Sequence, residues 1–228
     1  MKKIGLIFAM KEELEETKSK LEFIKKYNIY DLIIYECSIN DKICYLIESG
    51  IGKVNAGFST QILIREFEVD CVINLGVAGS VSKEVKKTDI VVAENLVQHD
   101  FDLTSFGREK GTIPNVGKYI NCDKYLLSIA KKIKLNNNVF YGAIASGDIF
   151  VYEEAMGKKI NNKFGALCVE MEGAAIAQVC YLCKTPFLVI RSISDSPYEK
   201  DNNTTFEEFL ITSSKIVGEF AVKLLEKI

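Results

Sequence analysis

The stretch FLVI at Phe187–Ile190, followed at once by RSISD at Arg191–Asp195, is the clearest indication of the fold class. A short, continuous apolar run is typical of a strand that is buried on both faces. In open α/β sheets, ligands bind beyond the carboxyl ends of such strands. We therefore expect the polar residues of Arg191–Asp195 to lie at a ligand-binding edge.

Similar apolar runs alternate with amphipathic segments along the chain. The expected strands are Lys3–Phe8, Ile33–Ile39, Ile43–Glu48, Cys71–Leu75, Ile90–Val97, Val139–Ala145, Ala166–Val169 and Phe187–Ile190. The expected helices are Lys11–Lys25, Lys53–Phe67, Asp123–Ile133, Gly173–Leu182 and Phe206–Lys227. This alternation predicts an α/β fold with a largely parallel sheet. Residues 101–122 are the main irregular stretch, and no repeat or linker divides the chain, so we expect residues 1–228 to form a single domain.

The composition argues against several classes of protein. The chain has 228 residues, of which 48% are hydrophobic and 26% are charged, and its formal net charge is −2. The charges are interspersed, which predicts neither a nucleic-acid partner nor a membrane partner. We see no transmembrane stretch and no signal peptide after Lys2 and Lys3, and we expect a soluble cytoplasmic protein.

The cysteines and the single histidine do not indicate a metal site. There are seven cysteines, an odd number, and several lie in apolar runs, which favours free thiols in a reducing cytoplasm over a disulfide framework. Cys180 and Cys183 form a C-x-x-C pair, but the chain has no second pair, and His99 is its only histidine. A structural zinc site needs about four such ligands. We expect no metal, and a structural role for His99.

Acidic, small and soft residues gather where the expected strands end. The segments concerned are Ala9–Glu13, Ser49–Lys53, Gly76–Gly79, Ser146–Val151, Glu170–Gly173 and Arg191–Asp195. Neither a P-loop nor a complete dinucleotide fingerprint is present, because Asn55 stands where the third glycine of the fingerprint belongs. The residues alone thus predict an α/β enzyme for a small ligand, with acidic catalysts.

Structural roles would also account for several of these residues. Glu12 and Glu13 could serve only the dipole of the helix that they begin, and Asp195 could belong to a turn. Glu170 and Glu172 could cap the following helix. Phe150 and Met171 could simply be core residues. These alternatives stay open on the residues alone.

Taken together, the segments resemble the 5′-methylthioadenosine/S-adenosylhomocysteine nucleosidases of the nucleoside phosphorylase superfamily. The resemblance rests on GLIFAMKEE (5–13), SGIGKVNA (49–56), GVAG (76–79), SGDIF (146–150), VEME (169–172) and RSISD (191–195). It extends from residue 3 to about residue 220. It implies a single three-layer α/β domain with a central, mostly parallel mixed sheet flanked by helices.

The resemblance also implies an activity. Such an enzyme hydrolyses the N-glycosidic bond of 5′-methylthioadenosine, S-adenosylhomocysteine and also 5′-deoxyadenosine, and releases adenine and the 5′-substituted ribose. This reaction serves methionine salvage and the recycling of the methyl cycle, and it uses no cofactor.

The resemblance assigns the catalytic roles to four residues. Asp195 would protonate the leaving purine, which requires a raised pKa. Glu172 would hold the ribose hydroxyls and stabilise the positive charge that develops on the sugar. Glu13 would orient and deprotonate the attacking water. Arg191 would position Glu13 by a charged hydrogen bond.

The resemblance assigns other residues to substrate binding. Phe150 would stack on adenine, and Val151 would recognise the base through its backbone. The further contacts would come from Met171 under the ribose, from Met10, Ile51 and Phe206 around the sugar and the 5′-thio group, and from Val77, Ala78, Gly79 and Ser194. Val77 stands where many relatives carry serine, and Ser80 replaces a glycine. Val77 thus removes a hydroxyl next to the expected ribose or water site.

The irregular stretch would have a role in a homodimer. In the family, this loop crosses the dimer interface, and here it would be residues 101–107. Leu103 and Phe106 would then help to close the neighbour's 5′-alkylthio pocket.

Two alternative functions remain at this point. A phosphorylase on the same fold would need cations to bind phosphate, but the chain has only Arg65, Arg108 and Arg191, and it offers Glu12 and Glu13 in the first loop. A non-enzymatic adenosine-binding module would not need three catalytic carboxylates. Within the hydrolase interpretation, a larger 5′ group such as that of aminodeoxyfutalosine also stays open.

Overall fold

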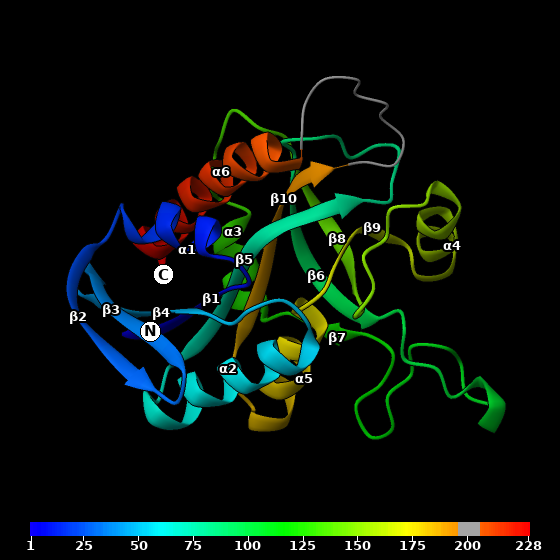
Figure 1. Ribbon diagram of the computed structural model, residues 1–228, viewed down its shortest axis with the longest axis horizontal. Helices are drawn as coiled ribbons and strands as arrows, with labels where there is room; N and C mark the ends of the chain where they lie inside the picture. Colours follow the sequence, from blue (N-terminus) through cyan, green and yellow to red (C-terminus); the bar gives the residue numbers. More distant parts are fainter. Residues whose placement is uncertain (196–205) are drawn as a thin grey trace.

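The strands form one sheet that runs through the middle of the molecule (Figure 1). The computed structural model describes residues 1–195 and 206–228, and for 206–208 it describes the backbone only. The strands are β1 (Lys3–Phe8), β2 (Glu22–Ile29), β3 (Leu32–Ile39), β4 (Lys42–Glu48), β5 (Cys71–Ser80), β6 (Ile90–Gln98), β7 (Ile120–Asn121), β8 (Val139–Ser146), β9 (Ala166–Glu170) and β10 (Phe187–Asp195). The helices are α1 (Lys11–Lys18), α2 (Lys53–Glu66), the 3₁₀ turn η1 (Thr104–Phe106), α3 (Lys124–Ala130), α4 (Glu154–Phe164), α5 (Gly173–Cys183) and α6 (Phe206–Lys227).

The sheet is mixed, and part of it closes on itself. The strand order is β10-β6-β8-β9-β5-β1-β4-β3-β2, and β10 also pairs with β5, so five strands form a ring. Among the described strands, five pairings are parallel and five are antiparallel, which is a larger antiparallel share than the sequence predicts. This closure places β5 and β10, which are distant in the sequence, side by side.

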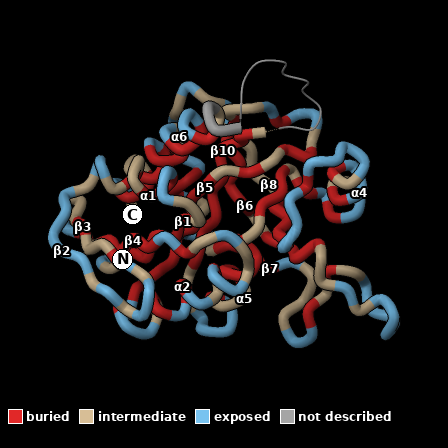
Figure 2. Tube along the Cα trace, viewed as in Figure 1, coloured by how far each residue is buried: buried red, intermediate tan, exposed pale blue. Residues whose placement is uncertain are grey.

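Helices cover both faces of the sheet, which confirms the expected α/β class. In Figure 1, α1, α3 and α6 lie on one side, while α2 and α5 pack against each other on the other side. Figure 2 shows that buried residues follow the strands through the centre. Residues Phe187–Ser194 of β10 are all buried, as expected for a strand that is covered on both faces.

The predicted helix Lys11–Lys25 is wrong in its second half. The helix α1 ends at Lys18, and Glu22–Ile29 forms β2, which pairs with β3 in an antiparallel hairpin. The sequence-based prediction rested on helical spacing, but Ile24 is exposed and faces no core. Instead, Tyr27 packs edge-on against Phe67, with 5.1 Å between the ring centroids. Tertiary pairing thus outweighs local periodicity here.

Two strands continue further than predicted, and this extension builds the site. The strands β5 and β10 were expected to end at Leu75 and Ile190, but they remain paired through Gly79 and Asp195. In the register, Arg191 lies opposite Gly76, and Asp195 lies opposite Gly79. The glycine-rich segment and the RSISD segment are therefore adjacent strand ends rather than two loops.

The helix α4 was not predicted. Met156, Ile160 and Phe164 have helical spacing, and Ile160 and Phe164 are buried in a small second core. Gly157, Asn161 and Asn162 are weak helix formers that obscure this signal. Residues 101–122 are irregular as expected, apart from η1 and the short strand β7.

The cysteines agree with the expectation of free thiols. All seven are free, and all except Cys183 are buried. Among the described residues, none of the helices has the length and apolar character that a membrane crossing requires.

Candidate active site

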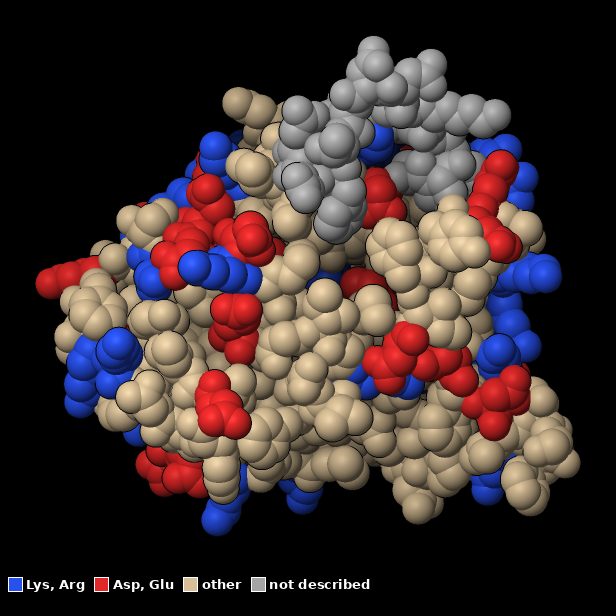
Figure 3. Space-filling view, viewed as in Figure 1, with Lys and Arg blue, Asp and Glu red and all other residues tan. Residues whose placement is uncertain are grey.

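A cavity of about 120 Å³ opens at the carboxyl ends of the central strands. Figure 3 shows acidic atoms deep in a hollow on this face of the molecule. The cavity is lined by Ala9, Met10, Glu13, Ile51, Val77, Ala78, Gly79, Phe150, Val169, Glu170, Met171, Glu172, Ser194 and Asp195. A smaller cavity shares Gly79, Phe150 and Asp195 with it and adds Val151. The structure therefore brings together most of the residues that the sequence singled out.

Glu13 enters the cavity from the first turn of α1. Its Oε2 atom accepts hydrogen bonds from the backbone N–H groups of Ala9 (3.0 Å) and Met10 (3.1 Å). Its Oε1 atom accepts one from the N–H of Val77 (2.9 Å). Glu13 thus lies in the first turn of α1, where an acid favours the helix dipole, and it also lines the cavity. Glu12, in contrast, is exposed to solvent.

The contact between Val77 and Glu13 does not depend on the side chain at position 77. Because Val77 holds Glu13 through its backbone, the loss of a hydroxyl leaves this contact unchanged. Gly76 is also required, because a Cβ atom there would lie 2.7 Å from Glu13 Oε1. Burial raises the pKa of Glu13, while the positive charge of Arg191 and the three N–H donors oppose that effect.

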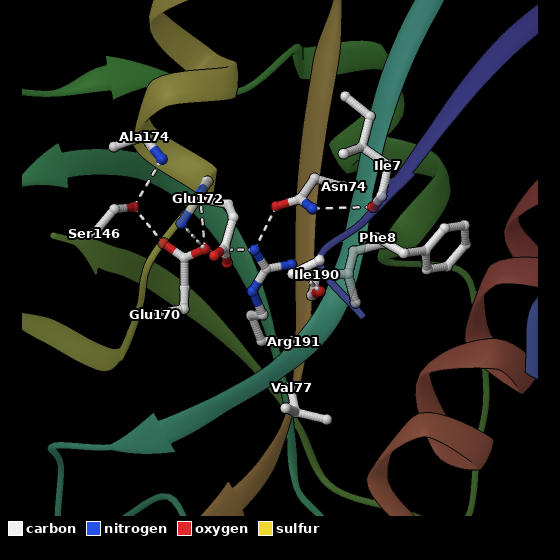
Figure 4. Close-up of polar contacts among 12 residues, drawn as sticks. Ile7, Phe8, Asn74, Val77, Ser146, Glu170, Glu172, Ala174, Ile190 and Arg191 are labelled. Carbon is white, nitrogen blue, oxygen red and sulfur yellow. Dashed lines mark hydrogen bonds and ion pairs between the residues drawn. The ribbon is translucent and has the colours of Figure 1, made fainter. Parts of the chain in front are cut away.

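Arg191 does not make its expected hydrogen bond to Glu13, and that prediction is wrong. Its guanidinium lies beneath the cavity, where Nη2 donates to Glu170 and to the side-chain oxygen of Asn74 (Figure 4). Nη1 donates to the carbonyl of Ile190 at 3.2 Å. Arg191 therefore acts on Glu13 only through its charge.

Glu170 is the partner that sequence reasoning missed, and its capping role is confirmed. Glu170 Oε2 accepts from the N–H groups of Glu172 (3.1 Å) and Gly173 (2.7 Å), at the start of α5. Ser146 donates its hydroxyl proton to Glu170 Oε1 and accepts from Ala174 N–H at 2.7 Å (Figure 4). The donors to the Glu170 carboxyl group are thus the start of α5, the Ser146 hydroxyl and the buried arginine, so Glu170 has a structural role.

The carboxyl group of Glu172 accepts fewer hydrogen bonds from the described residues than that of Glu170. Its Oε1 atom accepts from the N–H of Gly52 at 2.8 Å, and its side chain does not cap α5. Burial, and then the negative charge of Glu170, raise the pKa of Glu172 to about 7, although Arg191 opposes this shift. At neutral pH this carboxyl group is therefore partly protonated.

Asp195 lies at the end of β10, opposite Gly79. The hydroxyl of Ser194 donates to its Oδ1 atom at 2.8 Å. Burial raises the pKa of Asp195, and the bond from Ser194 opposes the rise. A Cβ atom at position 79 would lie 2.8 Å from Asp195 Oδ2, so only glycine leaves space for this carboxyl group.

The expected binding residues occupy three kinds of position. Phe150 is 58% exposed and lines both cavities. Val151 is buried and lines the smaller one. Leu103 and Phe106 do not line this chain's cavity, and Phe106, the last residue of η1, is 80% exposed. In Figure 1 the green segment that includes η1 projects from the body. Phe206 begins α6, but its side chain lies outside the described residues.

The potential metal ligands do not converge. No group of three or more His, Cys, Asp or Glu residues is arranged to hold a metal ion in the described part of the chain. His99 is buried, and its Nε2 atom has no partner among the described residues. Cys180 is buried, while Cys183 points to Gln61 with 3.5 Å between Sγ and Oε1.

Comparisons with known proteins agree with this geometry. The family described as the Phosphorylase superfamily matches residues 3–228. A 5′-methylthioadenosine/S-adenosylhomocysteine nucleosidase of Staphylococcus epidermidis is 39% identical over 230 residues, which cover 99% of this chain and 100% of the relative.

Solved structures are similar over the whole chain as well. The nucleosidase of that name from Neisseria meningitidis, in complex with methylthio-immucillin-A, superposes with a TM-score of 0.94 at 36% identity and covers 100% of both chains. A futalosine hydrolase of Helicobacter pylori superposes with a TM-score of 0.93 at 32% identity, covering 100% of this chain and 98% of that one.

The raised pKa of Glu172 predicts a pH-dependent loss of stability. The folded protein holds the Glu172 proton up to a pH of about 7, whereas an ordinary glutamate loses it near 4.5, so the folded state becomes less stable as the pH rises between these values. The cost at pH 8 is about 3 kcal/mol. We therefore expect Glu172→Gln to raise the Tm by roughly 5–10 °C at pH 8 and by much less at pH 5.

Thermal unfolding followed by circular dichroism from pH 5 to pH 8 measures this effect. Glu12→Gln is the matched control at an exposed position, and its Tm should follow that of the unsubstituted protein throughout. A constant difference between Glu172→Gln and the unsubstituted protein across this range would contradict the assignment.

Proposed function

The chain belongs to the phosphorylase superfamily, and we propose that within this family it is a hydrolase of adenine nucleosides. Its substrates are 5′-methylthioadenosine and S-adenosylhomocysteine, and its products are adenine and the 5′-substituted ribose. The observation that carries the proposal is the convergence of Glu13, Glu172 and Asp195 on one cavity. Relatives that are named for this activity match the chain from end to end.

Asp195 is the proposed general acid. Its raised pKa favours the protonated form, so it can donate a proton to N7 of the purine while the bond between C1′ and the base breaks. The electron pair of that bond then leaves with a neutral adenine rather than with an anion. Asp195 is ionised at the end of this step and recovers its proton before the next turnover.

Glu172 is the proposed ribose ligand. One of its oxygens is fixed by Gly52, which leaves the other to accept hydrogen bonds from the sugar hydroxyls. Breaking the glycosidic bond leaves positive charge on the ribose ring, as in other glycoside hydrolysis. A carboxylate next to the ring lowers the energy of that state.

Glu13 is the proposed base for the water nucleophile. Water gives its proton to Glu13 and its hydroxyl group to C1′, so that the overall reaction adds one water molecule. Burial raises the pKa of Glu13 and makes it a better base than an exposed glutamate. Its three backbone contacts fix the direction from which the water attacks.

Charge favours water over phosphate as the nucleophile. None of the described residues that line the cavity is a lysine or an arginine. Arg191 is committed to Glu170 and Asn74, and both Arg65 and Arg108 are exposed elsewhere. A phosphate dianion would meet carboxylates without a cation to pair with them, which makes phosphorolysis the weaker alternative.

The wider setting of the enzyme is part of the proposal. We expect a homodimer in which residues 101–107 of one protomer, including Leu103 and Phe106, close the 5′ end of its partner's cavity. Phe106 is 80% exposed in the single chain, so its side chain is available for such a contact. Free, mostly buried thiols support a cytoplasmic location. The 5′ end of the cavity, where these residues would lie, then sets the preference among 5′ groups, from 5′-deoxyadenosine to the futalosine type.

An assay of adenine release tests the proposed function. The purified protein should release adenine from 5′-methylthioadenosine at the same rate in phosphate-free buffer and in added phosphate, because water is the nucleophile. The product should be the free 5′-methylthioribose. Strict dependence of the rate on phosphate, with a sugar phosphate as product, would show a phosphorylase instead.

Replacing the acid should separate catalysis from binding. Asp195→Asn keeps the size of the side chain but cannot supply the proton, so we expect kcat to fall by about 10²–10⁴. Substrate binding, measured by calorimetry, should remain within a few-fold of the original. Asp31→Asn, at an exposed turn, is the control and should leave both quantities unchanged. Full activity of Asp195→Asn would exclude Asp195 as the acid.

A further inference from the structure

The loop between β4 and α2 reaches into the active site through one backbone group. Gly52 has a φ of +101°, a conformation that favours glycine, and its N–H points to Oε1 of Glu172 at 2.8 Å. This is the one hydrogen bond to the Glu172 carboxylate among the described residues. The position of the Gly52 peptide therefore sets the orientation of the Glu172 carboxylate.

The next residue ties this loop to the ends of two other strands. Lys53 donates its backbone N–H to Asp148 Oδ1 at 2.8 Å, and its ammonium group to Asp100 at 2.8 Å and to Gln98 Oε1 at 3.1 Å. The N–H of Asp148 in turn donates to Asp100 Oδ2 at 3.0 Å. Lys53, Asp100 and Asp148 thus form a closed ring of contacts, which we call the loop clamp.

The loop clamp differs from an ordinary surface ion pair in three respects. The side chains of Lys53 and Asp100 are only 19% and 16% exposed, so water screens their attraction less than at the surface. One cation faces two carboxylates, since Asp148 Oδ2 lies 4.0 Å from the same ammonium group. The clamp also includes backbone donors of two separate loops, which fixes the peptide planes as well as the side chains.

The loop clamp connects the Gly52 loop to strand ends on which α2 does not pack. The helix α2 packs on α5 and β1, whereas Asp100 and Asp148 follow β6 and β8. The glycine at position 52 fits tightly against the clamp, because a Cβ atom there would lie 3.2 Å from Asp148 Oδ1. Among the described residues, the clamp supplies the hydrogen bonds that connect the Gly52 loop with the ends of β6 and β8.

We propose that Lys53, Asp100 and Asp148 are positioning residues for ribose recognition, which hold the Gly52 N–H on Glu172 and so aim the free oxygen of that carboxylate at the sugar hydroxyls. This inference rests on the proposed function of Glu172. None of the three needs to touch the substrate. Without the clamp, the carboxylate of Glu172 loses its fixed orientation while the general acid Asp195, which is held by Ser194, keeps its place.

A comparison of two substrates distinguishes this role from a general structural one. The substrates are 5′-methylthioadenosine and its 2′,3′-dideoxy analogue, which lacks the hydroxyls that Glu172 would hold. We expect Asp148→Ala to lower kcat/KM for 5′-methylthioadenosine by about tenfold or more, the usual effect of losing an oriented hydrogen bond to a charged group. For the dideoxy analogue we expect a loss of less than about twofold, because the misplaced Glu172 has no hydroxyl to lose.

Conservative variants and a distant control complete the experiment. Asp148→Asn retains the Oδ1 acceptor for Lys53 N–H and should restore most of the activity. Lys53→Met, compared with Lys53→Arg, tests the same clamp from its cation if Asp148→Ala proves unstable in thermal unfolding. Lys131→Met breaks the exposed ion pair with Glu94 and should leave both substrates unaffected.

The results that would overturn the inference are distinct from failure of the proposed function. An equal loss on both substrates, or no loss on either, would show that the loop clamp does not act through the ribose hydroxyls. If the unsubstituted protein releases no adenine from 5′-methylthioadenosine, the proposed function fails, and the inference fails with it.

Discussion

Arg191 and Glu170 form an ion pair at the centre of the sheet, where the side chain of each is only 2% exposed. Two unpaired charges at this depth would cost several kcal/mol each, so the pair is stable only because further groups complete it. Asn74 and the Ile190 carbonyl accept from the guanidinium, while Ser146 and two N–H groups at the start of α5 donate to the Glu170 carboxyl group. The same contacts fix β5, β8, β10 and the start of α5 relative to one another.

The ion pair also controls the electrostatics of the cavity above it. Glu13, Glu170 and Glu172 are all buried near a single arginine, and Glu170 takes the hydrogen bonds of that arginine. Two carboxyl groups are thus left without a cation of their own, and burial raises the pKa of both. Such a site repels anions and retains protons, which suits acid–base chemistry with water and a neutral nucleoside. Asp195, on the adjacent strand end, extends this acidic surface.

The sequence predicts the part of the site that depends on chain order. Glu13, Glu172 and Asp195 follow short apolar strands, and parallel strands bring their carboxyl ends to one edge. The partner of Arg191 could not be predicted, because it depends on the register of β10 with β5 and on the N-terminus of α5. The loop clamp joins residues that are 47 and 95 positions apart, and no local pattern marks it. Similarly, the strand β2 forms because β3 offers it an edge, despite helical spacing in its sequence.

Arg191 pairs with one of three buried glutamates, Glu170, and leaves Glu172 to titrate near neutrality. Carbon-13 NMR of protein labelled at the glutamate side-chain carboxyl carbons measures this directly. We expect a resonance that titrates with a pKa of about 7 and that disappears in Glu172→Gln. Titration of every glutamate resonance near the ordinary pKa of about 4.5 would instead contradict this assignment of Glu172.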